Sequence, residues 1–294
     1  MFPLGRPQTK STAVVITGAS TGIGAACALA LDKSGYRVFA GIRDKADGTR
    51  LTASASPRLM PIGLDVTDPP SIAAALHTVK AMVGEQGLAG LINNAGIAVA
   101  GPVEVLPLSE WRRQFEVNIF GLISVTQAFL PLLRQGNGRV INIGSMSGRT
   151  AMPYMAPYAA SKHALLGLTT SLRIELHPWG VHVALIEPGA IATPIWGKTR
   201  KEVDAGESGW TREMKALYKT SFTKAKEAVS KIGAQAPPPG IVVDAVIHAL
   251  RSRFPKTRYL VGRDARIRAI LVKVLPDRVH DWLIRRVIGL RSHD

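Results

Sequence analysis

The chain has 294 residues, of which 46% are hydrophobic and 20% are charged, and it contains no long low-complexity tract. This composition excludes a disordered protein and predicts a chain long enough for one large α/β domain or two small ones. The formal net charge of +16 is concentrated toward the C-terminus and suggests nucleic acid or an anionic membrane as partners, but no nucleic-acid motif accompanies it, so we expect no nucleic-acid partner.

The N-terminal stretch Met1–Thr12 lacks the apolar segment of a signal peptide and leads into a strand. The chain has one cysteine, Cys27, which cannot form an internal disulfide and lies in an apolar helical pattern. We therefore expect Cys27 to be a core residue and the protein to be cytoplasmic.

A glycine-rich turn follows the first predicted strand, Ala13–Thr17. The glycines are spaced Gly-x3-Gly-x-Gly and lead into an apolar helix. In this context glycine lets backbone N–H groups and the positive helix end approach a pyrophosphate. The turn therefore predicts dinucleotide binding through Gly18, Ser20, Thr21, Gly22, Ile23 and Gly24.

The second predicted strand, Arg37–Ile42, ends in a basic residue, Arg43. Sites for NAD place an acidic side chain here on the ribose, whereas sites for NADP place a base near the 2′-phosphate. With no carboxylate before Asp44, the sequence favours NADP(H) over NAD(H). An ordinary solvated surface charge is the alternative for Arg43.

Two further strand ends carry polar residues. The third strand, at about 59–64, ends in Asp65 and Val66, where a short acid could accept a hydrogen bond from an adenine amino group. Alternatively, Asp65 could cap the helix that begins near Pro69. The fourth strand, Leu91–Ile92, is followed by Asn94, Ala95 and Gly96, which suit a ligand edge, although a turn alone would also explain them.

A long helix is predicted over Pro107–Leu133 and carries Asn118 in an apolar run. Its charge-free part, Val117–Leu133, is shorter and more polar than a membrane-spanning helix, so we expect a buried core helix. Asparagine competes for backbone hydrogen bonds inside helices, and its presence here indicates a functional role.

The fifth predicted strand, Arg139–Ile143, leads to Ser145, and a helix follows from Tyr158. Tyr158 and Lys162 are four residues apart, so their side chains share one helix face. A phenol has a pKa of about 10, and a neighbouring ammonium can lower it by roughly one to three units. Tyr158 is therefore a candidate proton shuttle, although one such pair could also arise by chance.

A sixth strand, His182–Ile186, precedes Pro188 and Gly189, and a last strand is predicted over Arg258–Val261. Strands alternating with helices predict an α/β fold, a doubly wound Rossmann-type parallel sheet of about seven strands, with ligands at the carboxyl ends of the strands. We expect residues 1–294 to form a single domain.

Two helical segments extend this predicted domain. Residues at about 194–236 predict a helical lid over the substrate, with a stiff hinge at 237–240. Basic amphipathic helices at about 263–291 could pack on the body, on a partner subunit, over the site or in a membrane interface.

The motifs together resemble the short-chain dehydrogenases/reductases over about residues 13–193. They are Thr17-Gly18-x3-Gly22-x-Gly24, Asn93-Asn94-Ala95-Gly96, Asn118, Ser145, Tyr158-x3-Lys162 and Pro188-Gly189 with Thr193. The segments 243–246 and 255–259 resemble the branch of hydroxysteroid, retinol and 3-hydroxybutyrate dehydrogenases.

The resemblance implies a role for each of these residues. Tyr158 would be the acid/base, and Ser145 would hold the substrate oxygen. Lys162 would lower the pKa of Tyr158 and bind the nicotinamide ribose, and Asn118 would position a relay water. A loop would hold the nicotinamide carboxamide through Pro188, Gly189, Ile191 and Thr193.

The expected function is NADP(H)-dependent interconversion of an alcohol and a ketone or aldehyde on a lipophilic substrate of steroid, retinoid or fatty type. Alternatives are a cofactor-binding regulatory or scaffold protein and an NAD-dependent dehydrogenase of small hydroxy acids. We expect no metal, a homodimer or homotetramer, and peripheral membrane contact through the C-terminal helices. The expected substrate contacts are Ser145, Val99, Met152, Met155 and Trp196, although the apolar ones could instead be core or lid packing.

Overall fold

The computed structural model describes residues 11–290. Most of the N-terminal stretch expected to lack a signal segment, and Arg291 at the end of the expected C-terminal extension, lie outside the described residues. Seven strands form one parallel sheet in the order β3-β2-β1-β4-β5-β6-β7. The strands are β1 (Ala13–Ile16), β2 (Arg37–Ile42), β3 (Leu59–Gly63), β4 (Gly90–Asn93), β5 (Arg139–Ile143), β6 (His182–Pro188) and β7 (Arg258–Val261).

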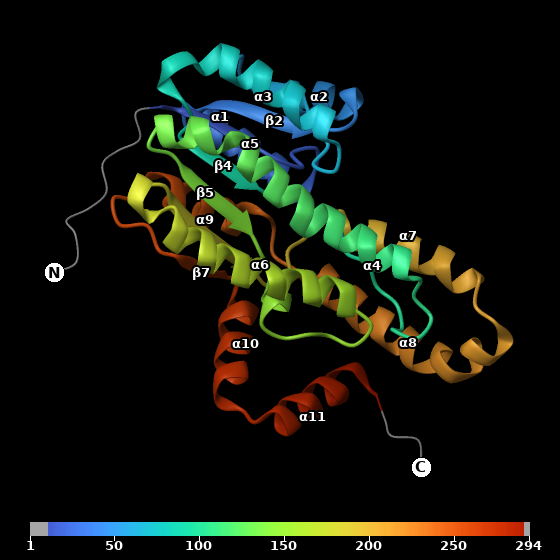
Figure 1. Cartoon of the computed structure of the whole chain (residues 1–294). Coiled ribbons are helices and arrows are strands. Elements are labelled where there is room, and N and C mark those ends of the chain that lie inside the picture. The colour runs from blue at the N-terminus through green and yellow to red at the C-terminus, as the bar shows by residue number, and fades with distance from the viewer. Residues whose placement is uncertain (1–10, 291–294) are drawn as a thin grey trace.

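This strand order confirms the predicted doubly wound sheet. The chain turns back between β1 and β4, and a ligand crevice is expected outside the carboxyl ends of the strands at such a point. Both faces of the sheet are covered by helices, as a parallel sheet requires (Figure 1).

The two faces bury alternate residues of each strand. Val14 and Ile16 face a core that includes α1 (Gly22–Lys33) and α9 (Gly240–Arg251). Ala13 and Val15 face a core that includes α3 (Pro69–Val83) and α5 (Leu122–Gln135). Cys27 of α1 is buried in the first core, where burial raises the pKa of its thiol to about 12. The other helices on these two faces are α2 (Lys45–Thr52) and α6 (Ala156–Glu175), respectively.

The predicted long helix is present, but it contains a turn that we did not predict. α4 (Leu108–Phe115) continues through a π-helical turn, Glu116–Gly121, into α5. Single π turns inside α-helices occur frequently at functional sites, and this one contains Asn118. By length and composition Leu108–Gln135 could cross a membrane, which is weak evidence, and half of its most apolar window is buried. Val125 and Phe129 of this helix pack in the core against the sheet.

Four helices lie beyond the sheet. α7 (Ile195–Ser208) and α8 (Arg212–Ala234) occupy the predicted lid, and α10 (Arg263–Val274) and α11 (Asp277–Ile288) form the C-terminal extension. Figure 1 shows the two pairs leaving the sheet in different directions, with α10 directly after β7. Short 3-10 turns cover Gly84–Gln86, Met146–Gly148 and His177–Trp179.

Candidate active site

One pocket, with a volume of about 920 Å³, extends along the carboxyl edge of the sheet. Residues of α7, α8, α10 and α11 complete its wall. It brings together most residues that the sequence predicted for the site: Gly18, Ser20, Thr21, Gly22, Ile23, Arg43, Asp65, Val66, Asn94, Ala95, Gly96, Ser145, Met152, Met155, Tyr158, Lys162, Pro188, Gly189, Ile191, Thr193 and Trp196.

Three predicted site residues do not line the pocket, namely Val99, Gly24 and Asn118. Val99 is buried, and its backbone N–H donates to Oε1 of Gln114 at 2.7 Å. Its side chain belongs to the packing beside the site, so its assignment as a substrate contact is wrong. Gly24 instead lies against the backbone of Gly18 and the amide of Asn94, and a Cβ at this position would collide with both. Its role is to allow α1 to approach the turn closely.

The glycine turn has the shape of a phosphate cradle. Gly18 and Gly22 have φ angles of 63° and 59°, in the left-handed region that favours glycine. The hydroxyl of Thr21 makes no capping hydrogen bond at the start of α1, and the first turn of this helix has no acidic residue. Asn94 braces the turn by donating from Nδ2 to the carbonyls of Thr17 and Gly18 at 3.0 and 2.9 Å. This arrangement fits a pyrophosphate at the helix N-terminus.

Arg43 has the position and freedom that a 2′-phosphate contact needs. It lies directly after β2, is exposed in the pocket, and makes no hydrogen bond or ion pair with the other residues of 11–290. The next carboxylate, Asp44, accepts from the N–H of Ala46 at 2.9 Å and caps α2. No nearby carboxylate therefore competes for the ribose end of the pocket.

Asp65 does not cap the helix α3, which was the alternative to its role in binding the adenine. The residue that caps α3 is Asp68, whose carboxylate accepts from the N–H of Ser71. Asp65 instead accepts at Oδ1 from the N–H and hydroxyl of Thr67, at 2.9 and 2.8 Å, while it lines the pocket. Its local turn keeps the carboxylate at the pocket edge.

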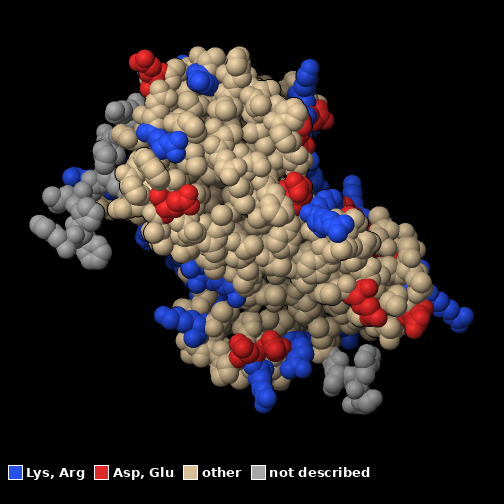
Figure 2. Space-filling model, viewed as in Figure 1, with Lys and Arg blue, Asp and Glu red and all other residues tan. Residues whose placement is uncertain are grey.

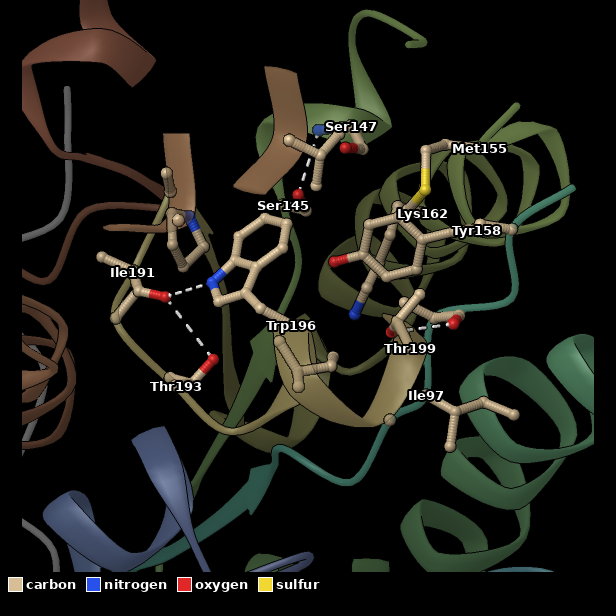
Figure 3. Close-up of a pocket in the computed structure, with 18 of the residues that line it drawn as sticks. Ile97, Ser145, Ser147, Met155, Tyr158, Lys162, Ile191, Thr193, Trp196 and Thr199 are labelled. Carbon is tan, nitrogen blue, oxygen red and sulfur yellow. Dashed lines mark hydrogen bonds between the residues drawn. The ribbon is translucent and has the colours of Figure 1, made fainter. Parts of the chain in front are cut away.

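Ser145 and Tyr158 face the same cavity (Figure 3). Oγ of Ser145 accepts from the N–H of Ser147 at 3.0 Å, and this bond fixes the serine at the start of a 3-10 turn. The Ser145 hydroxyl also acts on the Tyr158 phenol and favours its ionised form. The two hydroxyl groups can therefore donate to one oxygen atom placed between them.

Burial is the largest influence on the electrostatics of Tyr158. Burial raises the pKa of the Tyr158 phenol, and the effect of the Ser145 hydroxyl, which lowers it, only partly offsets this. Nζ of Lys162 donates to the carbonyl of Ile143 at 2.8 Å and lies 5.8 Å from the centroid of the Tyr158 ring. Here the ammonium is directed at a backbone carbonyl, and the lowering of the phenol pKa by Lys162 stays a prediction. Burial lowers the pKa of Lys162 itself to about 8.

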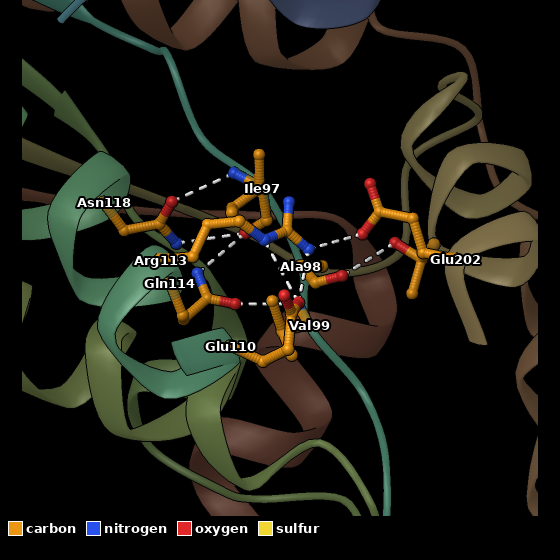
Figure 4. A network of polar contacts seen from close by, with 9 residues as sticks. Ile97, Ala98, Val99, Glu110, Arg113, Gln114, Asn118 and Glu202 are labelled. Atoms are coloured by element: carbon orange, nitrogen blue, oxygen red, sulfur yellow. Dashed lines mark hydrogen bonds and ion pairs between the residues drawn. The ribbon is translucent and has the colours of Figure 1, made fainter. Parts of the chain in front are cut away.

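Asn118 lies behind the pocket wall rather than in it (Figure 4). Its Oδ1 accepts from the N–H of Ile97 at 2.9 Å, and its Nδ2 donates to the carbonyl of Ile97 and to Oγ of Ser161, both at 3.1 Å. Gln114, fully buried one turn earlier, binds the backbone of Ile97 and Val99 in the same way. These two amides hold the segment 97–99, and the relay role of Asn118 stays a prediction.

The helix α7 is fastened to this segment and to α4 (Figure 4). Nη2 of Arg113 lies 2.7 Å from carboxylate oxygens of Glu110 and of Glu202, which belongs to α7. Oγ1 of Thr199 donates to the carbonyl of Ala98 at 3.1 Å. Trp196 donates from Nε1 to the carbonyl of Ile191 at 2.7 Å, beside Thr193 (Figure 3). The first lid helix therefore closes one side of the pocket.

The second lid helix, α8, is held by Tyr154, which our sequence analysis did not identify. The Tyr154 hydroxyl donates to Oγ of Ser221 at 2.7 Å, and its ring packs edge-on against Phe222 at a centroid distance of 5.0 Å. Tyr154 has a φ of 66°, which is unfavourable for a side chain of this size. Tyr154 lines the pocket, and in the sequence it lies between Ser145 and α8.

The C-terminal helices also contribute to the site. Asp264, at the start of α10, accepts at Oδ2 from the N–H of Ala190 at 3.0 Å. A side chain at Gly189 would collide with the Asp264 carboxylate, which explains the glycine there. His280 of α11 hydrogen-bonds Oγ1 of Thr150 through Nε2 at 3.2 Å. The sequence left open where the C-terminal helices α10 and α11 pack. In the structure they pack on the body of the domain, and their residues form part of the pocket wall.

A buried carboxylate fixes the end of β6. Glu187 receives two hydrogen bonds from Arg149, at 2.8 and 2.9 Å, and two from Arg258, at 2.9 and 2.7 Å. Burial alone would raise the pKa of Glu187, but these bonds outweigh it and lower the pKa. Arg149 follows the turn after Ser145, so this network joins the serine, β6 and β7 at the active edge. No sequence pattern indicated it.

Comparisons with known proteins agree with this geometry. Residues 12–204 match the family model described as short chain dehydrogenase. Retinol dehydrogenase 5 of Mus musculus is 36% identical, with 93% of this chain and 89% of that protein covered. 17-beta-hydroxysteroid dehydrogenase type 6 of Bos taurus is 36% identical, with 93% and 87% covered. A short chain dehydrogenase from Burkholderia cenocepacia J2315, solved in complex with NADP, is 28% identical with a TM-score of 0.70, covering 97% of this chain and all of that one.

Proposed function

The chain belongs to the short-chain dehydrogenase/reductase family, in the branch with retinol and hydroxysteroid dehydrogenases, and on this premise we propose that it interconverts a lipophilic alcohol and its carbonyl compound with NADP(H). Membership makes it an NAD(P)-dependent oxidoreductase. The choice of NADP(H), the lipophilic substrate and the roles of individual residues are the proposal. The observation that carries it is the pair of hydroxyl groups, Ser145 and Tyr158, facing one cavity beside a phosphate cradle.

When bound in the cradle, NADPH would supply the hydride for reduction of the carbonyl carbon. Ser145 and Tyr158 donate hydrogen bonds to the carbonyl oxygen, where negative charge develops, and Tyr158 transfers its proton to that oxygen. The raised pKa of Tyr158 keeps the phenol protonated at neutral pH, as this direction requires. Lys162, held by Ile143, would hold the ribose.

Arg43 supports the preference for NADP(H). Its guanidinium is free at the end of β2, and the neighbouring carboxylate of Asp44 is occupied as a helix cap. A free guanidinium at this place can form charge-assisted hydrogen bonds with a 2′-phosphate.

The size and lining of the pocket support a lipophilic substrate. The volume of about 920 Å³ includes room beyond the dinucleotide cradle, beside Met152, Met155 and Trp196. A pocket of this kind favours a long or polycyclic substrate over a small hydroxy acid. The presence of Ser145, Tyr158 and Lys162 together favours an active enzyme over a regulatory or scaffold protein.

We also propose that the outer face of α10 and α11 contacts an anionic membrane from the cytoplasmic side. Large apolar residues are exposed on these two helices. Figure 2 shows Lys and Arg, with some Asp and Glu among them, on this part of the surface. Such a face suits the boundary between headgroups and acyl chains. The exposed apolar residues are Ile267, Ile270, Val274, Val279, Trp282 and Val287. The expected homodimer or homotetramer stays a prediction, to be tested by light scattering.

The test of the proposed function is Tyr158→Phe. NADPH oxidation is first screened with retinal, steroid ketones, fatty aldehydes and small ketones. With any accepted substrate, Tyr158→Phe should lower the rate at least about 100-fold, as expected for loss of a general acid, while NADPH binding changes little. Tyr218→Phe, on the exposed side of α8, is the control and should retain its rate. A Tyr158→Phe protein with more than about a tenth of the rate would contradict the mechanism.

A further inference from the structure

A cation without a partner lies in the wall of the substrate pocket. Arg268, in the middle of α10, lines the pocket and is mostly buried. Within residues 11–290 its guanidinium makes no hydrogen bond and no ion pair. Burial lowers the pKa of Arg268, despite the opposite pull of Asp264. A guanidinium that is largely removed from water without hydrogen bonds is unfavourable, and an anionic partner offsets this loss.

The other cations of the pocket are engaged, exposed or located elsewhere, and Lys198 and Arg200 are exposed on α7. Lys226 forms ion pairs with Asp204 at 3.2 Å and with Glu207. Lys162 donates to the carbonyl of Ile143. Arg43 lies at the far end of the dinucleotide cradle. Arg268 is therefore distinguished by being both mostly buried and free.

The position of Arg268 is on the substrate side of the site. Asp264, one helical turn earlier, is occupied by the N–H of Ala190. The helix α10 packs against the turn Met146–Gly148, which directly follows Ser145. The guanidinium thus enters the pocket from the helix that flanks the serine, and the same wall of the pocket continues with apolar side chains of Leu271, Leu283, Ile284 and Val287.

We infer that Arg268 binds an anionic group, a carboxylate, sulfonate or phosphate, of an amphiphilic substrate whose apolar chain lies along α11. Val287 both lines the pocket and is 70% exposed, so the apolar wall reaches the pocket mouth. This inference rests on the proposed function and narrows its substrate class. A guanidinium suits such anions because it can donate two parallel hydrogen bonds.

The experiment measures binding without turnover. Decanoate and its neutral analogue decanol are titrated into the full-length protein saturated with NADP⁺, and binding is followed by calorimetry. The wild type should bind decanoate, and Arg268→Leu should weaken decanoate binding at least about 10-fold, the effect of a hydrogen bond to a charged group. Decanol binding should stay within about twofold. Arg268→Lys should restore part of the affinity for decanoate.

Arg266→Leu is the matched control, because Arg266 is exposed on the same helix and does not line the pocket. Equal losses for decanoate and decanol, or an equal effect of Arg266→Leu, would overturn the inference. Weaker NADP⁺ binding in Arg268→Leu and Arg268→Lys, with decanoate unaffected, would assign the guanidinium to a cofactor phosphate and would also overturn it. A protein that binds decanoate through Arg268 but reduces no carbonyl compound would instead contradict the proposed function alone.

Discussion

Replacing Glu187 by glutamine should destabilise the protein strongly, because the carboxylate is the shared acceptor of two arginines. It receives four hydrogen bonds of 2.7–2.9 Å, and it is almost completely buried. Removing one partner of a buried ion pair typically costs 3–5 kcal/mol. The side chains of Arg149 and Arg258 are 25% and 33% exposed and can regain water, so we expect the lower end, about 3 kcal/mol.

The assay is urea and thermal denaturation of Glu187→Gln and the wild type. For a chain of this size the entropy of unfolding is about 0.6 kcal/mol/K, so about 3 kcal/mol corresponds to a fall in Tm of roughly 5 °C. The control is Glu202→Gln, whose ion pair with Arg113 joins side chains that are 50% and 38% exposed. Such a surface pair contributes less than about 1 kcal/mol.

The pH dependence gives an independent check. The folded state lowers the pKa of Glu187 below its unfolded value of about 4.3, so the carboxylate stabilises the fold above that value. This stabilisation is lost as the pH falls through the folded pKa. The difference in free energy of unfolding between wild type and Glu187→Gln should therefore narrow below about pH 4. A difference under about 1 kcal/mol at pH 7, or one that persists unchanged in acid, would refute the reasoning.

Three further predictions concern the cofactor and the membrane. Arg43→Asp should shift the ratio of kcat/KM for NADPH and NADH at least about 10-fold toward NADH, through loss of a phosphate contact and added repulsion, and an unchanged ratio would remove Arg43 from the site. Because burial lowers the pKa of Lys162 to about 8, NADPH affinity should fall as the pH rises through about 8, and Lys162→Met, measured by fluorescence titration, should lack this dependence. Ile270→Glu and Val274→Glu, at residues 63% and 69% exposed, should reduce sedimentation with anionic vesicles at low salt, whereas equal sedimentation would contradict the membrane contact.

Local patterns in the sequence were sufficient to predict the sheet and most of the pocket. Strand, glycine turn and helix occur next to one another around Gly18–Gly24, and Tyr158 and Lys162 lie one helical turn apart, so short-range geometry determines where their side chains lie. The carboxyl ends of parallel strands share one edge, which is why residues predicted separately at several strand ends meet in one pocket.

Other features depend on side-chain direction and burial, which the local pattern does not specify. Val99 follows a strand end like its neighbours, but it is buried, its backbone N–H donates to Gln114, and it does not line the pocket. Spacing placed Lys162 near Tyr158 correctly, yet it could not show that burial raises the pKa of the phenol or that Nζ of Lys162 donates to the carbonyl of Ile143.

The contacts that hold the active edge together join residues far apart in the chain. Glu187 meets Arg149 and Arg258, and Asp264 meets Ala190, and none of these pairs has a periodicity or motif that a sequence reveals. The basic amphipathic helices near the C-terminus were predictable from the spacing of their apolar residues. The spacing could not show which arginine of α10 lines the pocket. Because α10 packs beside Ser145, Arg268 lines the pocket and Arg266 remains in solvent. Amphipathic spacing shows which face of a helix is apolar, whereas the surface that this face covers is set by the rest of the fold.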